Sequence, residues 1–117
     1  SRAYSLKAYC LVQQKKTKAA MKACEQGLKE HPDAGDLYCT KYAILAKQEK
    51  YKQGLQVVNK ALKQENLENK KEVLFARISA YESMFDFKTA YRYAKSYVKA
   101  YPKDARGKKE LTFLETR

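Results

Sequence analysis

Residues that interrupt helices are scarce in this chain. Its 117 residues include only four glycines and two prolines, and tryptophan is absent. Strong helix formers such as Lys, Ala, Leu, Gln and Glu are abundant instead. No apolar run approaches the length of about eighteen residues that a membrane-spanning helix needs. Because no alternating strand pattern is present either, the sequence predicts an all-α chain without a transmembrane segment.

Cysteine and histidine are too few for a disulfide framework or a metal site. Cys10, Cys24 and Cys39 are odd in number and match no zinc spacing, and His31 has no second ligand near it in sequence. The side chains that an active site needs are also missing. Ser79 and Cys39 lack an adjacent base, and neither paired carboxylates at catalytic spacing nor a Gly-rich phosphate loop is present. We therefore predict no metal, no cofactor and no enzymatic activity.

The first residues carry no targeting signal. The chain begins at Ser1 and Arg2 with no methionine and no short apolar stretch behind a basic start. We therefore expect the chain to be a segment of a longer protein whose targeting signal lies outside this segment. Free cysteines favour a reducing compartment such as the cytoplasm, but the sequence does not specify one.

The chain contains internal sequence repeats. A shift of 34 residues places Tyr4 on Tyr38 and Leu11 on Leu45, and a further shift of 36 carries Leu45 onto Tyr81. A fixed period in this range is typical of a solenoid, in which each unit must stack on a neighbour to bury its apolar face. The sequence predicts one domain over residues 1–117, with repeats at about 1–34, 35–70 and 71–104 and a C-terminal helix at about 104–116.

Apolar residues that recur with a helical period predict seven helices. The expected boundaries are about 4–14, 20–30, 37–47, 51–64, 71–84, 87–100 and 104–116. Pro32 and Pro102 close the first and third pairs, because proline cannot continue a helix. Residues 33–36 are expected to supply an acidic cap for the third helix, and Asp104 a cap for the last. Cys24 aligns with small and branched apolar residues in the other repeats, so we expect it in the core.

The last helix follows the repeat poorly and has two interpretations. It is either a solvating cap or the first helix of a fourth repeat. Its apolar residues, Leu111, Phe113 and Leu114, could pair between chains or contact a neighbouring repeat. The tyrosines at 81, 91, 93, 97 and 101 suggest packing between repeats, with contact to a partner as the alternative.

With these residues in place, the chain resembles the tetratricopeptide repeats (TPR), which are antiparallel helix pairs about 34 residues long. The family's small residue in the second helix is met by Ala20, Gly54 and Ala90, and its closing proline is met twice and replaced once by Asn66. The resemblance implies a right-handed α-solenoid. Its first helices would line a concave groove that holds an extended peptide or a partner helix.

The same resemblance predicts which residues line the groove. These are Arg2, Ser5, Tyr9, Val12, Gln13, Asp36, Cys39, Ala43, Lys47, Phe75, Ser79 and Glu82. Tyr9 and Phe75 could anchor a peptide side chain, because aromatic groups supply large contact area at low entropy cost. The alternative is that both pack against neighbouring helices.

One known use of the family is a clamp of lysine, asparagine and arginine that grips the C-terminal tail of heat-shock chaperones. The matching positions here carry Ser5, Tyr9, Thr40, Glu72 and Ala76, none of which agrees. A site built for paired charges discriminates strongly against losing them. We therefore predict that the chaperone tail is not a partner.

Positive charge is the other prominent feature, with 25 Lys and Arg against 13 acids and a net charge of +12. By the resemblance, second helices form the convex side, where the basic residues are Lys18, Lys22, Lys52, Lys60, Lys88, Arg92 and Lys95. The sequence thus predicts a scaffold for protein–protein interaction, with acidic partners attracted by this side. The alternative is RNA, ribonucleoprotein or another anionic surface bound through the convex face, and a merely solvated face is the third interpretation.

Overall fold

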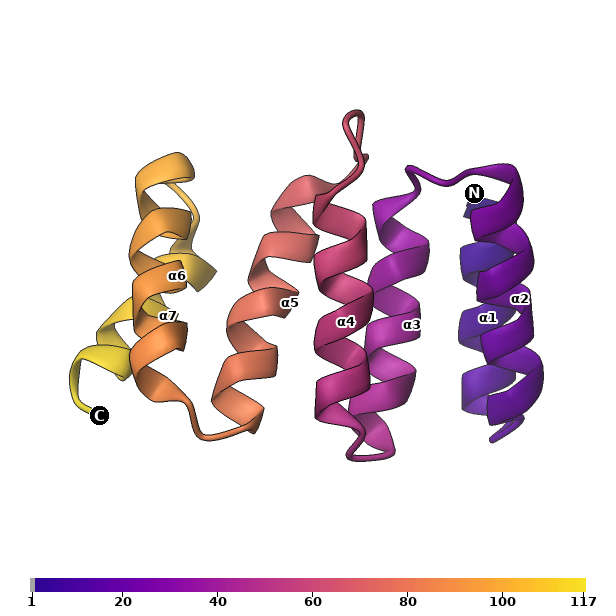
Figure 1. Ribbon diagram of the computed structural model, residues 1–117, viewed down its shortest axis with the longest axis horizontal. Helices are drawn as coiled ribbons and strands as arrows, with labels where there is room; N and C mark the ends of the chain where they lie inside the picture. The colour runs from indigo at the N-terminus through magenta and orange to yellow at the C-terminus, as the bar shows by residue number, and fades with distance from the viewer. Residues whose placement is uncertain (1) are drawn as a thin grey trace.

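The computed structural model of the protein describes residues 2–117, with side chains from Ala3 onward. Over that range it contains seven helices and no strand: α1 (Arg2–Gln13), α2 (Thr17–Glu30), α3 (Gly35–Lys47), α4 (Tyr51–Leu62), α5 (Lys70–Ser83), α6 (Phe87–Ala100) and α7 (Ala105–Glu115). They lie side by side along the longest dimension, with the two termini at opposite ends (Figure 1). The extents are 39 × 29 × 22 Å. Within the described range, no helix combines the length and apolarity needed to cross a bilayer.

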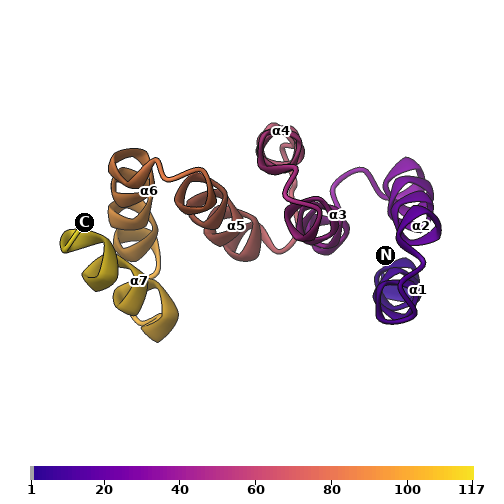
Figure 2. The ribbon, with the colours of Figure 1, turned by 90° about the horizontal axis from the view of Figure 1, so that it is seen from below.

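The helices form two layers, which Figure 2 shows end-on. One layer contains α1, α3, α5 and α7, and the other contains α2, α4 and α6. At the two ends, α1 and α7 bend away from the second layer, so the first layer has a concave outer face. Contacts run mainly between consecutive helices and between neighbouring helices of the first layer, α1 with α3 and α3 with α5. The predicted solenoid of helix pairs is confirmed.

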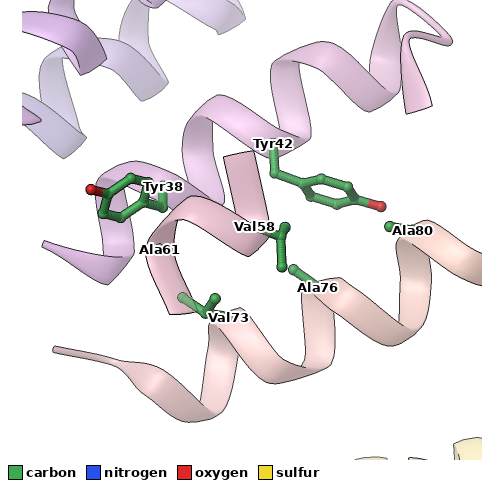
Figure 3. Close-up of a cluster of buried hydrophobic side chains, with 7 residues drawn as sticks. All are labelled: Tyr38, Tyr42, Val58, Ala61, Val73, Ala76 and Ala80. Atoms are coloured by element: carbon green, nitrogen blue, oxygen red, sulfur yellow. The ribbon is translucent and has the colours of Figure 1, made fainter. Parts of the chain in front are cut away.

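The central core joins two repeats through three helices. Tyr38 and Tyr42 of α3 lie against Val58 and Ala61 of α4, and α5 closes the cluster from below (Figure 3). The α5 members are Val73, Ala76 and Ala80. Small residues on α4 and α5 let these helices approach closely, while the tyrosine rings fill the space between layers. Repeats are therefore held together by shared side chains, as a stack requires.

The outer repeats have clusters of their own. Cys24 is fully buried on α2 beside Ala8 of α1, which confirms its predicted place in the core. At the other end, Tyr97 is only 2% exposed and its ring meets those of Phe75 and Tyr101 at 5.6 and 5.2 Å. Leu114 is buried in the same cluster, so it packs within the chain and is not free to pair with a second copy.

Three tight turns inside the helix pairs share one conformation. Lys15, Glu49 and Phe85 all have φ near +60°, the left-handed region that glycine normally occupies after a helix. In each turn the next residue donates a backbone hydrogen bond back across the turn, to the carbonyl oxygen of Leu11, Leu45 or Tyr81. Because these bonds satisfy carbonyls at the helix ends, the turns hold without glycine.

The loop before α3 differs from the prediction of an acidic cap. Ala34 occupies the N-cap position, and no side chain caps this helix end. Instead, the backbone of the long connection 63–69 reaches over, and the Glu68 N–H donates to the Asp33 carbonyl oxygen at 2.8 Å. Gly35 packs directly beneath that connection, where a side chain would overlap the Glu68 carbonyl.

The predicted cap of α7 is confirmed. Asp104 accepts from the Arg106 N–H at 3.0 Å and from the Tyr97 hydroxyl, and Lys71 lies 3.3 Å from its second oxygen. The Tyr97 hydrogen bond and then the Lys71 interaction lower the pKa of Asp104 to about 2. One carboxylate thus joins α7 to both α5 and α6.

Candidate functional site

A cavity of about 340 Å³ lies between α1 and α3 on the concave face. It is lined by Tyr9, Val12, Gln13, Cys39, Thr40, Ala43, Ile44 and Lys47. Six of these residues are predicted groove positions, and they come together because α1 and α3 run alongside each other in the same layer. The volume lies within the usual range for small-molecule and side-chain pockets, about 300–1,000 Å³.

Tyr9 is the most exposed large apolar side chain of this hollow, at 60% of its surface. Cys39 forms part of the opposite wall, where burial raises the pKa of its thiol to about 12. A thiol in that state is neutral and unreactive, so it contributes an apolar wall. The hollow therefore combines an open aromatic ring, an apolar floor and one lysine at the rim.

A second hollow of about 690 Å³ lies between α5 and α7. Its lining residues are Ser79, Glu82, Ser83, Phe87, Arg106, Lys109, Glu110 and Phe113. Only Ser79 and Glu82 were predicted from the sequence. The residues of α7 were missed because that helix follows the repeat poorly. If α7 is treated as the first helix of a fourth repeat, its residues are expected to line the groove.

Phe75 does not offer an open ring. The Arg106 guanidinium lies 3.9 Å from its ring centroid, and the edge of Tyr97 meets it on another side. Arg106 is itself held by Glu72, at 3.2 and 3.1 Å to the two carboxylate oxygens. The structure therefore places Phe75 among neighbouring helices, in agreement with the packing alternative.

Three predicted groove residues line neither hollow. Ser5 is half-buried on α1, and Asp36 lies in the first turn of α3 with one carboxylate oxygen buried and without a hydrogen-bond partner. Phe75 is covered as described. Arg2 lies outside the residues whose side chains the structure describes.

Two carboxyl groups face each other across the second hollow. Burial first, and then hydrogen bonding and charge from Glu110, raise the pKa of Glu82 to about 8. The cationic groups that line the same hollow are Arg106 and Lys109 of α7. At neutral pH Glu82 therefore retains its proton, which reduces charge repulsion from Glu110 between α5 and α7.

Glu82→Gln is expected to raise the melting temperature at pH 8–9 and to leave it unchanged near pH 4. The folded-state pKa of about 8 lies above the ordinary value of 4.5. Stabilisation by protonated Glu82 is therefore complete below pH 4.5 and is lost as the pH rises through 8. Glutamine keeps a hydrogen-bonding group that does not titrate.

The measurement is thermal unfolding followed by circular dichroism from pH 4 to pH 9. Glu115→Gln, an exposed residue at the end of α7, makes the same change in charge and serves as the control. A Glu82→Gln effect of equal size at every pH would contradict the retained proton.

All seven basic positions predicted for the convex side are exposed on the second layer. Lys18 and Lys22 lie on α2, Lys52 and Lys60 on α4, and Lys88, Arg92 and Lys95 on α6. In the part of the chain from residue 3 onward, none of them forms a salt bridge. In the same part, no three His, Cys, Asp or Glu residues come together as a metal site would require.

Solved structures with a similar arrangement of helices include two TPR domains of one human protein. The first TPR domain of the human RPAP3 protein matches with a TM-score of 0.81 and 15% identity, over 97% of this chain and 87% of that one. The second TPR domain of human RPAP3, solved in complex with the HSP70 peptide SGPTIEEVD, gives 0.78 and 12%, over 97% and 93%.

A larger assembly, Naa15/Naa10 bound to HypK-THB, contains a segment that matches with a TM-score of 0.73 and 23% identity. It covers 98% of this chain but only 17% of that one. No protein-family model and no curated protein sequence matches the chain. The sequence repeat, the two helical layers and the likeness to TPR domains agree, and the chain therefore has the tetratricopeptide-repeat fold.

Proposed function

We propose that the protein is a non-catalytic interaction scaffold that binds a peptide or a helix of a protein partner in its concave groove. The observation that carries this proposal is the cavity between α1 and α3, with the open Tyr9 ring on its wall. Exposed aromatic residues beside an apolar pocket are typical binding anchors. The RPAP3 domain bound to a peptide supports the same use by analogy of fold.

The basic second layer would accelerate encounter with acidic partners. A net charge of +12 attracts anionic proteins over distances of about 10 Å at ordinary ionic strength. This charge affects mainly the association rate, whereas the groove determines which segment remains bound.

Tyr9→Ala is expected to weaken binding of a groove ligand at least about tenfold, because truncating a central aromatic anchor removes most of its contact area. A ligand would first be selected from a displayed peptide library and its affinity measured by fluorescence anisotropy. Leu6→Ala is the matched control, since Leu6 lies on the same helix, is 56% exposed and does not line the cavity. Equal losses for the two variants would contradict the groove proposal.

The HSP70 peptide itself is expected not to bind. Within the predicted clamp positions, Ala76 lies in the central core and the Glu72 carboxylate is already paired with Arg106. No lysine or arginine stands at any of these positions to hold the terminal carboxylate.

RNA or ribonucleoprotein binding through the convex face is the second candidate, favoured by the seven exposed basic side chains. It predicts binding that weakens steeply with salt, that Lys22→Glu combined with Arg92→Glu abolishes, and that Tyr9→Ala leaves unchanged. The same anisotropy measurements with labelled RNA separate the two functions.

A further inference from the structure

Arg77 lies on a strip of α5 between its two packing faces. Val73 and Ala80 pack in the central core with α4, and Ile78 packs with α6. The helical period places Arg77 between these faces, on the side opposite the groove-lining Ser79. The arginine is half-buried there, facing the second layer.

The Arg77 guanidinium lies over an aromatic ring but has no acidic partner. It lies 3.6 Å from the centroid of the Tyr93 ring, and its Nε is buried without a hydrogen-bond partner. Among residues with described side chains, no salt bridge includes it. Burial lowers the pKa of Arg77, and repulsion from Arg92 acts in the same direction.

A second cation shares the same ring. The Arg92 guanidinium lies 5.3 Å from the Tyr93 centroid. Tyr81, which also contacts Tyr93 with ring centroids 5.5 Å apart, completes the surroundings. Two guanidinium groups thus converge at one aromatic side chain, and the groups that influence Arg77 there are tyrosines and Arg92, with no carboxylate among them.

The equivalent residue of the preceding repeat has the acidic partner that Arg77 lacks. The 36-residue shift that places Leu45 on Tyr81 also places Lys41 on Arg77. Lys41 has an acidic partner, Glu25 of α2, at 4.0 Å. The 34-residue shift carries Glu25 onto Asn59, a neutral residue. The third repeat therefore keeps the half-buried cation, but the second repeat carries Asn59 where the first repeat supplies the acid Glu25 to Lys41.

We propose that Arg77 and Arg92 bind a carboxylate from an acidic segment of a protein partner, on the face of the solenoid opposite the groove. Guanidinium and carboxylate groups match in geometry and form strong paired hydrogen bonds. Stacking on Tyr93 holds the Arg77 fork in place before the ligand arrives, so less side-chain entropy is lost on binding. The site is independent of the groove and would give the scaffold a second contact.

A carboxylate fits this site better than an RNA strand does. Both guanidinium groups lie beside the same ring, which suits a single anion, whereas RNA binding needs a row of phosphate contacts. Strand binding also uses free aromatic faces for base stacking. Tyr93 already contacts both Tyr81 and Arg77, so this pair of rings offers no such platform.

The test uses the full chain and a fluorescein-labelled hexaglutamate peptide in anisotropy titrations. Arg77→Gln and Arg92→Gln are each expected to weaken binding about fivefold to tenfold, as expected for charged pairs in a partly buried site. The matched controls are Lys41→Gln, at the equivalent position of the preceding repeat, and Lys88→Gln, an exposed charge on α6. Each control is expected to change the affinity less than about twofold, as general screening of surface charge predicts.

A variant that gives Arg77 an acidic partner within the chain distinguishes loss of the binding site from loss of the fold. Asn59→Glu restores the acid that the preceding repeat carries, and should weaken peptide binding while raising the melting temperature. Equal effects of all four Gln variants would overturn the proposal in favour of diffuse attraction. Tighter binding of a labelled oligouridine with the same pattern of losses would overturn the carboxylate assignment.

Discussion

Ile78→Ala is expected to lower the free energy of unfolding by about 3 to 4 kcal/mol. Ile78 is fully buried and packs with Ala90, Ala94, Tyr97 and Leu114 at the junction of α5, α6 and α7. Its small neighbours cannot expand into the space that the lost methyl and methylene groups leave. Both the lost transfer free energy and the residual cavity therefore contribute.

The measurement is urea unfolding followed by circular dichroism, with Ile78→Val as the graded control. Valine removes one methylene group and should cost about 0.5 to 1.5 kcal/mol. Because solenoid repeats are coupled only to their neighbours, amide exchange should accelerate most in α6 and α7 and least in α2. A loss below about 1 kcal/mol for alanine would show that this junction can collapse around the cavity.

Gly35→Ala is expected to lower the free energy of unfolding by about 2 to 3 kcal/mol. The added methyl group would overlap the backbone carbonyl of Glu68, and Asn69 lies immediately beyond it. A carbonyl on the main chain cannot turn aside as a side chain can. The connection 63–69 would have to move, which would strain the hydrogen bond from Glu68 to Asp33.

Gly54→Ala is the matched control, because the added methyl group there would meet side chains alone, the Tyr42 ring at 2.9 Å and the Leu45 Cβ at 3.9 Å. That ring can shift slightly, and alanine favours the helix by about 1 kcal/mol over glycine. The Gly54 variant should therefore lie within about 1 kcal/mol of the wild type. A cost at Gly54 equal to that at Gly35 would contradict the distinction between backbone and side-chain obstruction.

Helix boundaries could be predicted where the chain carries a strong stop or start. Residues 87–100 match α6 at both ends, because Asp86 caps the first turn and Tyr101 precedes a proline. No such signal follows α4, and the prediction overran its end at Leu62 by two residues. Lys63 and Gln64 there form tighter bonds to carbonyls three residues earlier, a geometry that the apolar period does not reveal.

The candidate site was predictable only in part. The wall formed by α1 and α3 follows from repeat spacing, so residues such as Tyr9 and Ala43 could be placed before the structure was known. The wall formed by α7 could not, because its lysines mask the apolar pattern. The role of Arg77 could not be predicted either, because it depends on the absence of an acid at position 59, where Asn59 stands, and on the Tyr93 ring of the following helix.

The contact between the connection 63–69 and the loop before α3 limits how this stack can be recombined. Repeats that touch only through helix faces can be exchanged as cassettes, each cut at its own boundary. Here a cut after residue 34 separates Asp33 from Gly35, and removal of residues 35–70 also discards Glu68, the hydrogen-bond partner of Asp33. A chimera that borrows the second helix pair must therefore carry residues 33–70 as one piece.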